Sequence, residues 1–293
     1  EAMHERARIV GAREPAQPTH PDHTRQPARR RGILAVMTMA QASPRIDVLG
    51  VGVTNTNPTA AVEQVVSWVE AGERQYVCVV PVSAIMAAQR DPAVLRAIEN
   101  AGMAVPDGMP MVWAGRYAGA PEIERVYGPD LMAAICAEAA ARGWRTFLYG
   151  GGDGVAKRLA SALEARFPGL EIAGHYSPPF RQLAETERDQ IAKRINESRA
   201  AIVWVGLSTP KQDLWMAEMI ERLEAPAILL GVGAAFDIHA GLKRRPPDWL
   251  GPLGLFWLYR LLQEPRRLWR RYLVDIPQFL ARVTLRRPFL RDS

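Results

Sequence analysis

The sequence has few of the residues and runs that mark several common classes of protein. Its 293 residues include only two cysteines, Cys78 and Cys136, which lie far apart inside apolar runs. So low a number excludes a disulfide framework or a cysteine zinc site and favours a reducing compartment. No run of 18 uninterrupted apolar residues occurs, so we expect no membrane-spanning helix. The N-terminal segment also lacks the hydrophobic core of a signal peptide.

The motifs of several familiar chemistries are absent as well. There is no D-x-D triplet, the usual carboxylate clamp for a metal–diphosphate complex. Three of the five histidines lie within residues 1–43, and none has zinc-ligand spacing. Neither the dinucleotide fingerprint G-x-G-x-x-G, nor a Walker A loop, nor a G-x-S-x-G elbow occurs. We therefore expect no metal and no cofactor, so that Arg, Lys and helix N-termini would have to stabilise any leaving-group charge.

The net charge of +6 is concentrated at the two ends of the chain. Residues 1–43 carry a net +3 and residues 244–293 a net +7, whereas residues 44–243 carry −4. This distribution argues against a core that binds nucleic acid and for a basic tail that meets an anionic surface. We predict a disordered N-terminal extension at 1–43, a folded core at 44–243 and a short helical appendage at 244–293.

Apolar runs alternate with helical segments through the core. The predicted strands are 46–53, 76–80, 103–105, 145–149, 170–174, 201–205 and 227–231. Near-continuous apolar runs are typical of parallel strands that are covered on both faces. Asn57-Pro58 and Asp91-Pro92 each place a capping side chain before a proline at a helix start. The pattern predicts an α/β fold with a mostly parallel sheet, which binds ligands at the carboxyl ends of its strands.

Polar or glycine-rich sequence follows several of these strands. Asp107 comes directly after one strand, where a carboxylate can serve as a base, although a simple turn or a helix cap would look the same. The segment GGGDG at 150–154 suits backbone binding of an anion at a helix N-terminus, or a tight turn. The segment GVGAAFD at 231–237 suits a ribose or base, or close packing of helix on sheet.

The segment GLSTPKQ at 206–212 has a structural explanation for most of its residues. Thr209, Pro210 and Gln212 match a capping box, which requires no ligand. Lys211 is not explained in this way, because a cation at a helix start opposes the helix dipole. Lys211 therefore predicts an anionic partner such as a phosphate.

Arg125 lies shortly before a helix that we expect to start at Asp130. The planar guanidinium of arginine can bind two oxygens of a diphosphate at once. A solvated ion pair with Glu124 is the ordinary alternative, and the sequence does not decide between them.

Together these segments resemble the WecG/TagA/CpsF glycosyltransferase family (glycosyltransferase family 26), from about residue 45 to the C-terminus. The motifs that carry the resemblance are PDGMPMVW (106–113), ERVYGPDL (124–131), FLYGGGDG (147–154), VGLSTPKQD (205–213), GVGAAFDIHAG (231–241) and GLFWLYRLLQEPRRLWRRYL (254–273). Their order and spacing make the resemblance specific. It implies a Rossmann-like α/β core with a C-terminal appendage that associates with membranes.

The resemblance also implies an activity. Members of this family are inverting, metal-independent transferases that move a sugar (a hexose, an N-acetylhexosamine or a uronic acid) from UDP to a polyprenyl-diphosphate-linked glycan. They act in the biosynthesis of cell-surface polysaccharides such as teichoic acid or exopolysaccharide. The implied location is cytoplasmic and peripheral, on the inner face of the plasma membrane, with no nucleic acid partner. Two alternative functions stay open, namely another UDP-sugar enzyme and a catalytically weak membrane-docked scaffold. The chain could also form a homo-oligomer, which the sequence does not decide.

Individual roles follow from the same resemblance. Asp107 matches the proposed catalytic base, with Arg125 and Gln212 also assigned to the catalytic site. The residues assigned to substrate binding are Ser83, Gly108, Gly150, Gly151, Gly152, Asp153, Gly206, Lys211, Gly231, Gly233, Phe236, Asp237, Arg260 and Arg267. Many members have Thr-x-Asn after the second strand, whereas this chain has VVPVS at 79–83 and only Ser83 offers a hydroxyl. This departure leaves the donor sugar open.

The appendage combines apolar and basic residues in a run too short to span a bilayer. We expect an interfacial helix on an anionic membrane, with packing on the core or on a second subunit as the alternative. The family resemblance also implies that some of these arginines reach the active site and bind the diphosphate of the acceptor. The apolar residues of that expected face are Trp249, Leu250, Leu253, Phe256, Trp257 and Leu261, and the basic ones are Arg260, Arg266, Arg267, Arg270 and Arg271.

Overall fold

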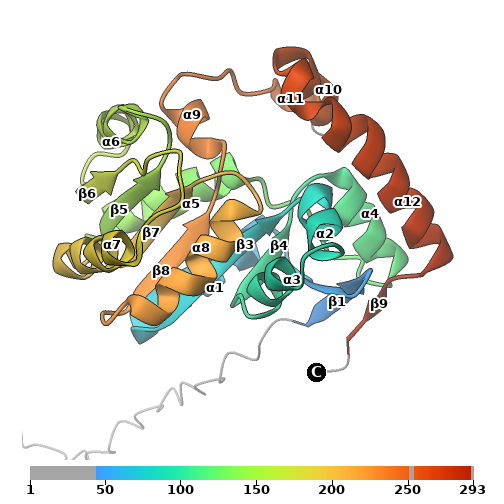
Figure 1. Ribbon diagram of the computed structural model, residues 1–293, viewed down its shortest axis with the longest axis horizontal. Coiled ribbons are helices and arrows are strands. Elements are labelled where there is room, and N and C mark those ends of the chain that lie inside the picture. Colours follow the sequence, from blue (N-terminus) through green and yellow to red (C-terminus); the bar gives the residue numbers. More distant parts are fainter. Residues whose placement is uncertain (1–43, 251–253, 292–293) are drawn as a thin grey trace, which may run out of the picture. The chain divides into compact units, whose positions relative to one another are not determined.

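The computed structural model describes residues 44–250 and 254–291. The predicted extension at 1–43 and Leu253 of the predicted membrane face lie outside the described residues. The described part contains one large parallel sheet, a small antiparallel sheet and a helical C-terminal segment (Figure 1).

The large sheet has six strands in the order β4-β3-β8-β7-β5-β6, all parallel. The strands are β3 (Arg74–Val80), β4 (Met103–Pro106), β5 (Arg145–Gly150), β6 (Glu171–Tyr176), β7 (Ile202–Gly206) and β8 (Ala227–Gly231). These six strands lie where the apolar runs predict them, and the mostly parallel α/β fold is confirmed.

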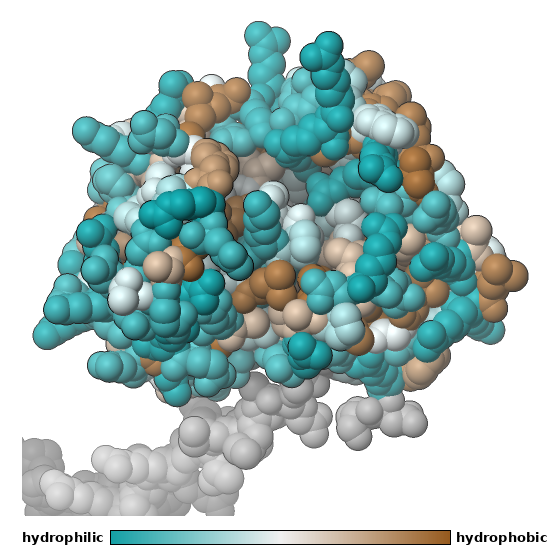
Figure 2. All heavy atoms as spheres, viewed as in Figure 1, coloured by the Kyte–Doolittle hydropathy of each residue, from teal (hydrophilic) through white to brown (hydrophobic). Residues whose placement is uncertain are grey.

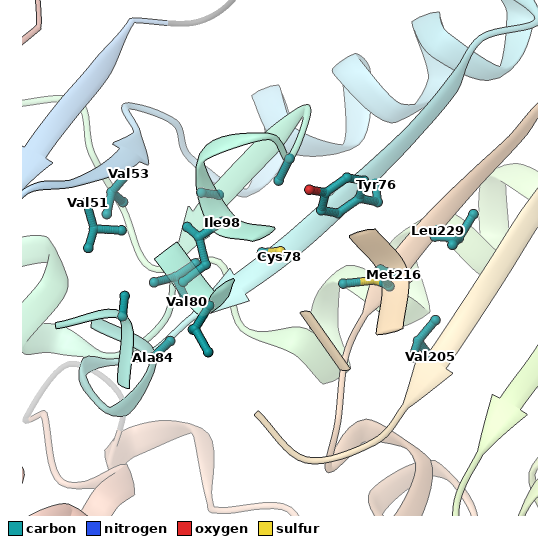
Figure 3. Packing of buried hydrophobic residues seen from close by; sticks show 14 of the residues in the cluster. Val51, Val53, Tyr76, Cys78, Val80, Ala84, Ile98, Val205, Met216 and Leu229 are labelled. Carbon is teal, nitrogen blue, oxygen red and sulfur yellow. The ribbon is translucent and has the colours of Figure 1, made fainter. Parts of the chain in front are cut away.

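Helices cover both faces of this sheet, which explains why its strands are apolar on both sides. On β3, Tyr76 and Cys78 join one buried cluster, while Val77 and Val79 join the other. Figure 3 shows part of the first cluster, in which Cys78 of β3 lies near Met216 of α8. The helices on the first face are α2 (Val82–Ala88), α3 (Pro92–Glu99), α7 (Glu185–Ser198) and α8 (Lys211–Met219). The helices on the second face are α1 (Pro58–Ala71), α5 (Gly128–Arg142), α6 (Val155–Arg166) and α9 (Ala235–His239).

Two predicted helix starts are confirmed by their capping hydrogen bonds. The side chain of Asn57 accepts from the amide of Ala60 at 3.0 Å, directly before α1. The side chain of Asp91 accepts from the amide of Ala93 at 2.8 Å, directly before α3. Each side chain satisfies one of the amides that the first helical turn leaves unpaired.

The predicted strand 46–53 is wrong, because the chain forms a hairpin there. β1 (Arg45–Val48) and β2 (Val51–Thr54) pair antiparallel around Leu49 and Gly50, whose φ angles are 56° and 85°. Two successive left-handed residues make the tight turn that joins antiparallel strands. Leucine is not a usual turn residue, so the apolar run reads as one strand in the sequence.

The appendage begins after α9 and returns to the small sheet. Its elements are η2 (Asp248–Leu250), α10 (Phe256–Gln263), α11 (Pro265–Arg270), the π-helical turn η3 (Arg271–Asp275), α12 (Ile276–Leu285) and the short strand β9 (Phe289–Leu290). β9 pairs with β1, and Arg291 binds Glu99 at 2.6 Å and Asp47 at 3.2 Å. The C-terminal end of the appendage is therefore tied to the first strand of the chain. Among the described helices, none combines the length and the hydropathy needed to cross a membrane.

Candidate active site

The parallel strands bring their carboxyl ends to one edge of the sheet, and the segments predicted to bind ligand follow these ends. α6 follows β5 on one face, whereas α8 follows the neighbouring strand β7 on the other. In the same way, β3 leads into α2 and its neighbour β8 into α9, on opposite faces. Neighbouring strands whose connections diverge like this open a crevice at their ends, which is where such sheets bind ligands.

Asp107 is the first residue after β4. Its backbone amide donates to the carbonyl of Val80 on β3 at 3.1 Å, which holds the residue at the sheet edge. The helix α4 (Met109–Tyr117) begins after Gly108, whose φ of 91° favours glycine, and no side chain caps this helix. Asp107 is therefore not a helix cap, one of the two structural alternatives that the sequence left open.

The half-buried Asp107 carboxyl lies in a positively charged environment. Burial raises the pKa of this carboxyl above its usual value. The charges of Arg125, Arg260 and Arg271 oppose the rise, as does the hydrogen bond from the Gly108 amide. A carboxylate whose pKa is raised toward neutral pH, while it remains ionised, is a stronger general base.

Arg125 lies in the loop before α5, which is anchored beside β4. The amide of Val126 donates to the carbonyl of Pro106 at 2.8 Å. The Arg125 guanidinium lies 4.9 Å from the ring centre of Tyr127 and 4.2 Å from that of Phe256. No ion pair joins Arg125 to Glu124 or to another described residue, so the ordinary alternative for this arginine is not observed.

The appendage supplies further cations to the same place. Arg260 on α10 and Arg271 on η3 are half-buried, and neither forms an ion pair within the described part of the chain. Burial lowers the pKa of Arg271, and the neighbouring Arg260 lowers it further. Unpaired arginines beside one another are costly unless an anion joins them, which favours a phosphate-bearing ligand here.

Two phenols complete this cluster. Burial and the nearby Asp107 carboxylate raise the pKa of Tyr127 to about 12. Burial also raises the pKa of Tyr272, against the lowering effect of Arg260 and Arg271. The Tyr127 hydroxyl is buried and has no hydrogen-bond partner within the described residues. Both phenols keep their protons at neutral pH and can donate hydrogen bonds.

Gln212 is buried, with 2% of its surface exposed, and it fixes the end of β8. Its side-chain amide donates to the Gly231 carbonyl at 3.0 Å and, more weakly, to the Thr209 hydroxyl at 3.4 Å. The predicted capping box is wrong, because α8 starts at Lys211 after Pro210 and has no side-chain cap. The shorter of the two hydrogen bonds of Gln212 joins the start of α8 to the end of the neighbouring strand β8.

Close packing accounts for several of the glycines expected to bind substrate. A Cβ atom on Gly150 would lie 2.7 Å from the backbone of Gly206, and one on Gly206 would lie 2.3 Å from the Phe236 ring. Phe236 is only 1% exposed. We expected Phe236 to face the nucleotide, but its ring packs beneath the loops and presents no face to a ligand.

Replacing Gly206 by alanine is therefore expected to reduce the free energy of unfolding by about 1–3 kcal/mol, the usual cost of overpacking. The buried Phe236 ring has no room to move away. Gly152→Ala is the matched control, since its Cβ atom would make only an ordinary contact of 3.8 Å with Val155. Urea unfolding of both variants measures the difference, and equal midpoints would show that the contact between Gly206 and the Phe236 ring is not tight.

The other polar residues of the predicted site separate into two groups. Asp153, in the loop after β5, and Lys211, at the start of α8, are exposed. Neither forms an ion pair within residues 44–250 and 254–291, so both can meet a ligand. Ser83 lies in the first turn of α2, which follows β3, and its hydroxyl is buried without a partner among the described atoms.

Asp237 and Arg267, by contrast, belong to one chain of ion pairs. Asp237 binds Lys243 at 2.6 Å, and Lys243 binds Glu264 at 3.2 Å. Glu264 in turn binds the exposed Arg267 at 2.9 Å. These pairs link α9 to the appendage, so Asp237 and Arg267 have partners where we had expected substrate-binding groups.

Three groups near Asp107 were not assigned to the site from the sequence, namely Tyr127, Arg271 and Tyr272. Arg271 was placed with its neighbours on the membrane face, although the resemblance implied that some arginines of the appendage reach the site, and its charge acts on Asp107. Tyr127 stands two positions after Arg125 in the motif ERVYGPDL. This spacing was the only local sign that its ring contacts the arginine. Nothing local marks Arg271 or Tyr272, because the fold of the appendage brings them to the site.

Comparison with known proteins confirms the resemblance. The sequence model of the Glycosyl transferase WecG/TagA/CpsF family matches residues 46–293. A Bacillus spizizenii protein named N-acetylglucosaminyldiphosphoundecaprenol N-acetyl-beta-D-mannosaminyltransferase is 31% identical over 196 residues, covering 67% of this chain and 73% of that protein. A Staphylococcus aureus protein of the same name is 27% identical over 251 residues, covering 84% of this chain and 96% of that protein. The chain therefore belongs to the WecG/TagA/CpsF family and is a glycosyltransferase.

Proposed function

We propose that the chain is an inverting, metal-independent transferase that moves a sugar from a UDP-sugar to a polyprenyl-diphosphate-linked glycan. The observation that carries this proposal is the half-buried Asp107, whose carboxyl feels the charges of Arg125, Arg260 and Arg271, none of which forms an ion pair in the described residues. A carboxylate beside unpaired cations suits a reaction that needs both a base and the stabilisation of a diphosphate.

The chemistry follows from these groups. Asp107 accepts the proton of an acceptor hydroxyl as its oxygen attacks the anomeric carbon of the donor. The new glycosidic C–O bond forms as the bond from that carbon to the diphosphate oxygen breaks, so a single displacement inverts the anomeric centre. UDP leaves with the bonding electron pair, and the arginines together with Lys211 stabilise its charge.

The acceptor class comes from the relatives. Their name describes transfer of N-acetylmannosamine to N-acetylglucosaminyl-diphosphoundecaprenol, and we propose an acceptor of this class for the present chain. The donor sugar is a hexose, an N-acetylhexosamine or a uronic acid. We do not narrow it further, because the segment 79–83 contains neither the Thr nor the Asn that many members have there. The product would enter a cell-surface polysaccharide.

The decisive measurement is UDP release from a panel of UDP-sugars, with and without a lipid-diphosphate sugar. We expect release that depends on the acceptor. An epimerase would instead convert the UDP-sugar without any acceptor, and a scaffold without activity would do neither.

Activity is also expected to survive excess EDTA. Among the residues that the structure describes, no three His, Cys, Asp or Glu side chains gather closely enough to hold a metal ion. The cations near Asp107 can supply the positive charge that a metal would otherwise provide at a diphosphate. Loss of transfer on chelation, with recovery in magnesium or manganese, would disprove the metal-free mechanism.

The appendage is also proposed to dock on the inner face of the plasma membrane. Its apolar residues separate into two sets, in contrast to the single membrane face expected from the sequence. Leu250 and Leu268 are buried, and Phe256 packs on Arg125. Figure 2 shows apolar side chains along the flank that α10–α12 occupy in Figure 1. The exposed set between η2 and α12 consists of Trp249, Leu258, Leu262, Trp269, Leu273, Leu280 and Leu285.

The full-length protein is expected to float with vesicles that contain anionic lipid and to be released by salt. Leu262, Trp269 and Leu285 are 74%, 48% and 89% exposed, so replacing all three by serine should abolish flotation without unfolding the protein. Phe180→Ser is the control, because this side chain is 94% exposed but lies outside the appendage, within residues 44–243. Equal flotation of the triple variant and the parent would show that the appendage is not the docking surface.

A further inference from the structure

Three side chains from two distant parts of the chain form a triangle, and the charge of its arginine acts on Asp107. The Arg125 guanidinium lies 4.2 Å from the ring centre of Phe256 and 4.9 Å from that of Tyr127. The two rings meet edge to face, with centres 5.7 Å apart and planes at 66°. Arg125 therefore lies in the angle between an aromatic ring of the core and one of the appendage.

This arrangement restricts the guanidinium without occupying its hydrogen-bond donors. Arg125 has neither a hydrogen bond nor an ion pair to another described residue. Aromatic rings attract a cation through their faces and leave its N–H groups available for ligand oxygens. Arginine has many side-chain rotamers, so fixing one of them in advance reduces the entropy lost when the ligand binds.

The two rings are held on separate supports. Tyr127 directly precedes α5, in a loop anchored by the hydrogen bond from Val126 to Pro106. Phe256 is the first residue of α10. Glu264, directly after this helix, forms an ion pair with Lys243, which in turn pairs with Asp237 on α9, so α10 is joined to the core. The position of Arg125 thus depends on how the appendage lies on the core.

We propose that Phe256 is a positioning residue, whose ring holds the guanidinium of Arg125 against Tyr127 and beside Asp107. The inference rests on the proposed function, because it assigns to Arg125 and Asp107 their parts in sugar transfer. Phe256 itself touches no reacting atom. The appendage therefore organises the catalytic site through an aromatic contact as well as through its own arginines.

The prediction for pH dependence follows from the groups around Asp107. The pKa of this carboxyl is lowered by the charges of Arg125, Arg260 and Arg271. Asp107 in turn raises the pKa values of the Tyr127 and Tyr272 phenols. If Arg125 moves away, the pKa of Asp107 rises. A base must be ionised to act, so the acid limb of the pH profile of kcat/KM then moves to higher pH.

The test uses full-length Phe256→Leu, Phe256→Tyr and Arg125→Gln, together with the double variant Phe256→Leu/Arg125→Gln. Phe256→Leu should lower kcat/KM roughly tenfold, the upper range for a partly desolvated cation–π contact, and move the acid limb upward. Phe256→Tyr, which keeps an aromatic ring at this position, should retain the kcat/KM and the acid limb of the parent. In the Arg125→Gln background, Phe256→Leu should cause no further loss, because the two residues act as one unit. Tyr259→Leu is the control, since the structure shows no ring contact for this neighbouring aromatic among the described residues.

Additive losses in the double variant would overturn the proposal, and so would an equal shift in the Tyr259→Leu control. Titration of the Asp107 carboxyl carbon by NMR reports the same pKa without turnover. If the parent protein transfers no sugar, the proposed function fails, yet the NMR titration still decides whether Phe256 holds Arg125 beside Asp107. An unchanged Asp107 pKa in Phe256→Leu would then disprove the positioning role.

Discussion

Replacing Asp107 by asparagine is expected to lower kcat by at least about a hundredfold, the low end of the effect of losing a general base. The amide has nearly the same shape but cannot accept the acceptor proton. The affinity for UDP should change little, because the diphosphate is held by the arginines and by Lys211 rather than by a carboxylate. Steady-state kinetics with saturating acceptor, together with calorimetric titration of UDP, measures both quantities.

Glu124→Gln provides the matched control for this substitution. Glu124 is an exposed carboxylate next to Arg125, and it forms no ion pair with that arginine. Turnover of Glu124→Gln should stay close to that of the parent. Near-normal turnover of Asp107→Asn would exclude Asp107 as the base, whereas an equal loss in both variants would indicate a general effect of negative charge near the site.

The sheet could be predicted from the sequence because its strands are buried on both faces. A strand covered by helices on both sides must be apolar throughout, so runs such as 201–205 stand out in the sequence. The hairpin at 46–53 could not be recognised, since its turn at Leu49 and Gly50 contains only one of the usual turn residues. β9 is only two residues long and pairs with a strand at the other end of the chain.

The site was predictable only where it depends on local sequence. Asp107 comes directly after a strand, and the carboxyl ends of parallel strands are where ligands bind. The capping box predicted from the local sequence around Gln212 was wrong, because this side chain bonds to Gly231, 19 positions away. Phe236 appeared to belong to a binding loop, yet a short motif does not show which of its side chains points into the core.

Arg271 shows most clearly what the sequence could not decide, namely which arginines of the appendage face the site. It stands among Arg266, Arg267 and Arg270, and a run of arginines beside an apolar segment is typical of a membrane-facing helix. The chain changes helical geometry at this point, because α11 ends at Arg270 and the π-helical turn η3 begins at Arg271. This change in winding alters the direction of the side chains that follow, and the charge of Arg271 acts on Asp107.

Arg271→Gln is expected to lower kcat/KM by about a hundredfold, the low end for losing one preorganised group that stabilises developing charge. It should also change the pH profile. Burial raises the pKa of Asp107, and the charge of Arg271 opposes that rise. Without this charge the pKa rises further, so the ionised base is lost at a higher pH as the solution is made more acidic. The acid limb of kcat/KM should therefore move upward.

Arg282→Gln is the control for the same appendage, because Arg282 is exposed on α12 and forms no ion pair within the described residues. Its kinetics should match those of the parent. Measurements with a water-soluble, short-chain acceptor remove any contribution from membrane docking. If Arg271→Gln and Arg282→Gln behave alike, Arg271 acts only as surface charge. If Arg271→Gln loses activity but keeps the parent pH profile, its charge supports the diphosphate without acting on Asp107.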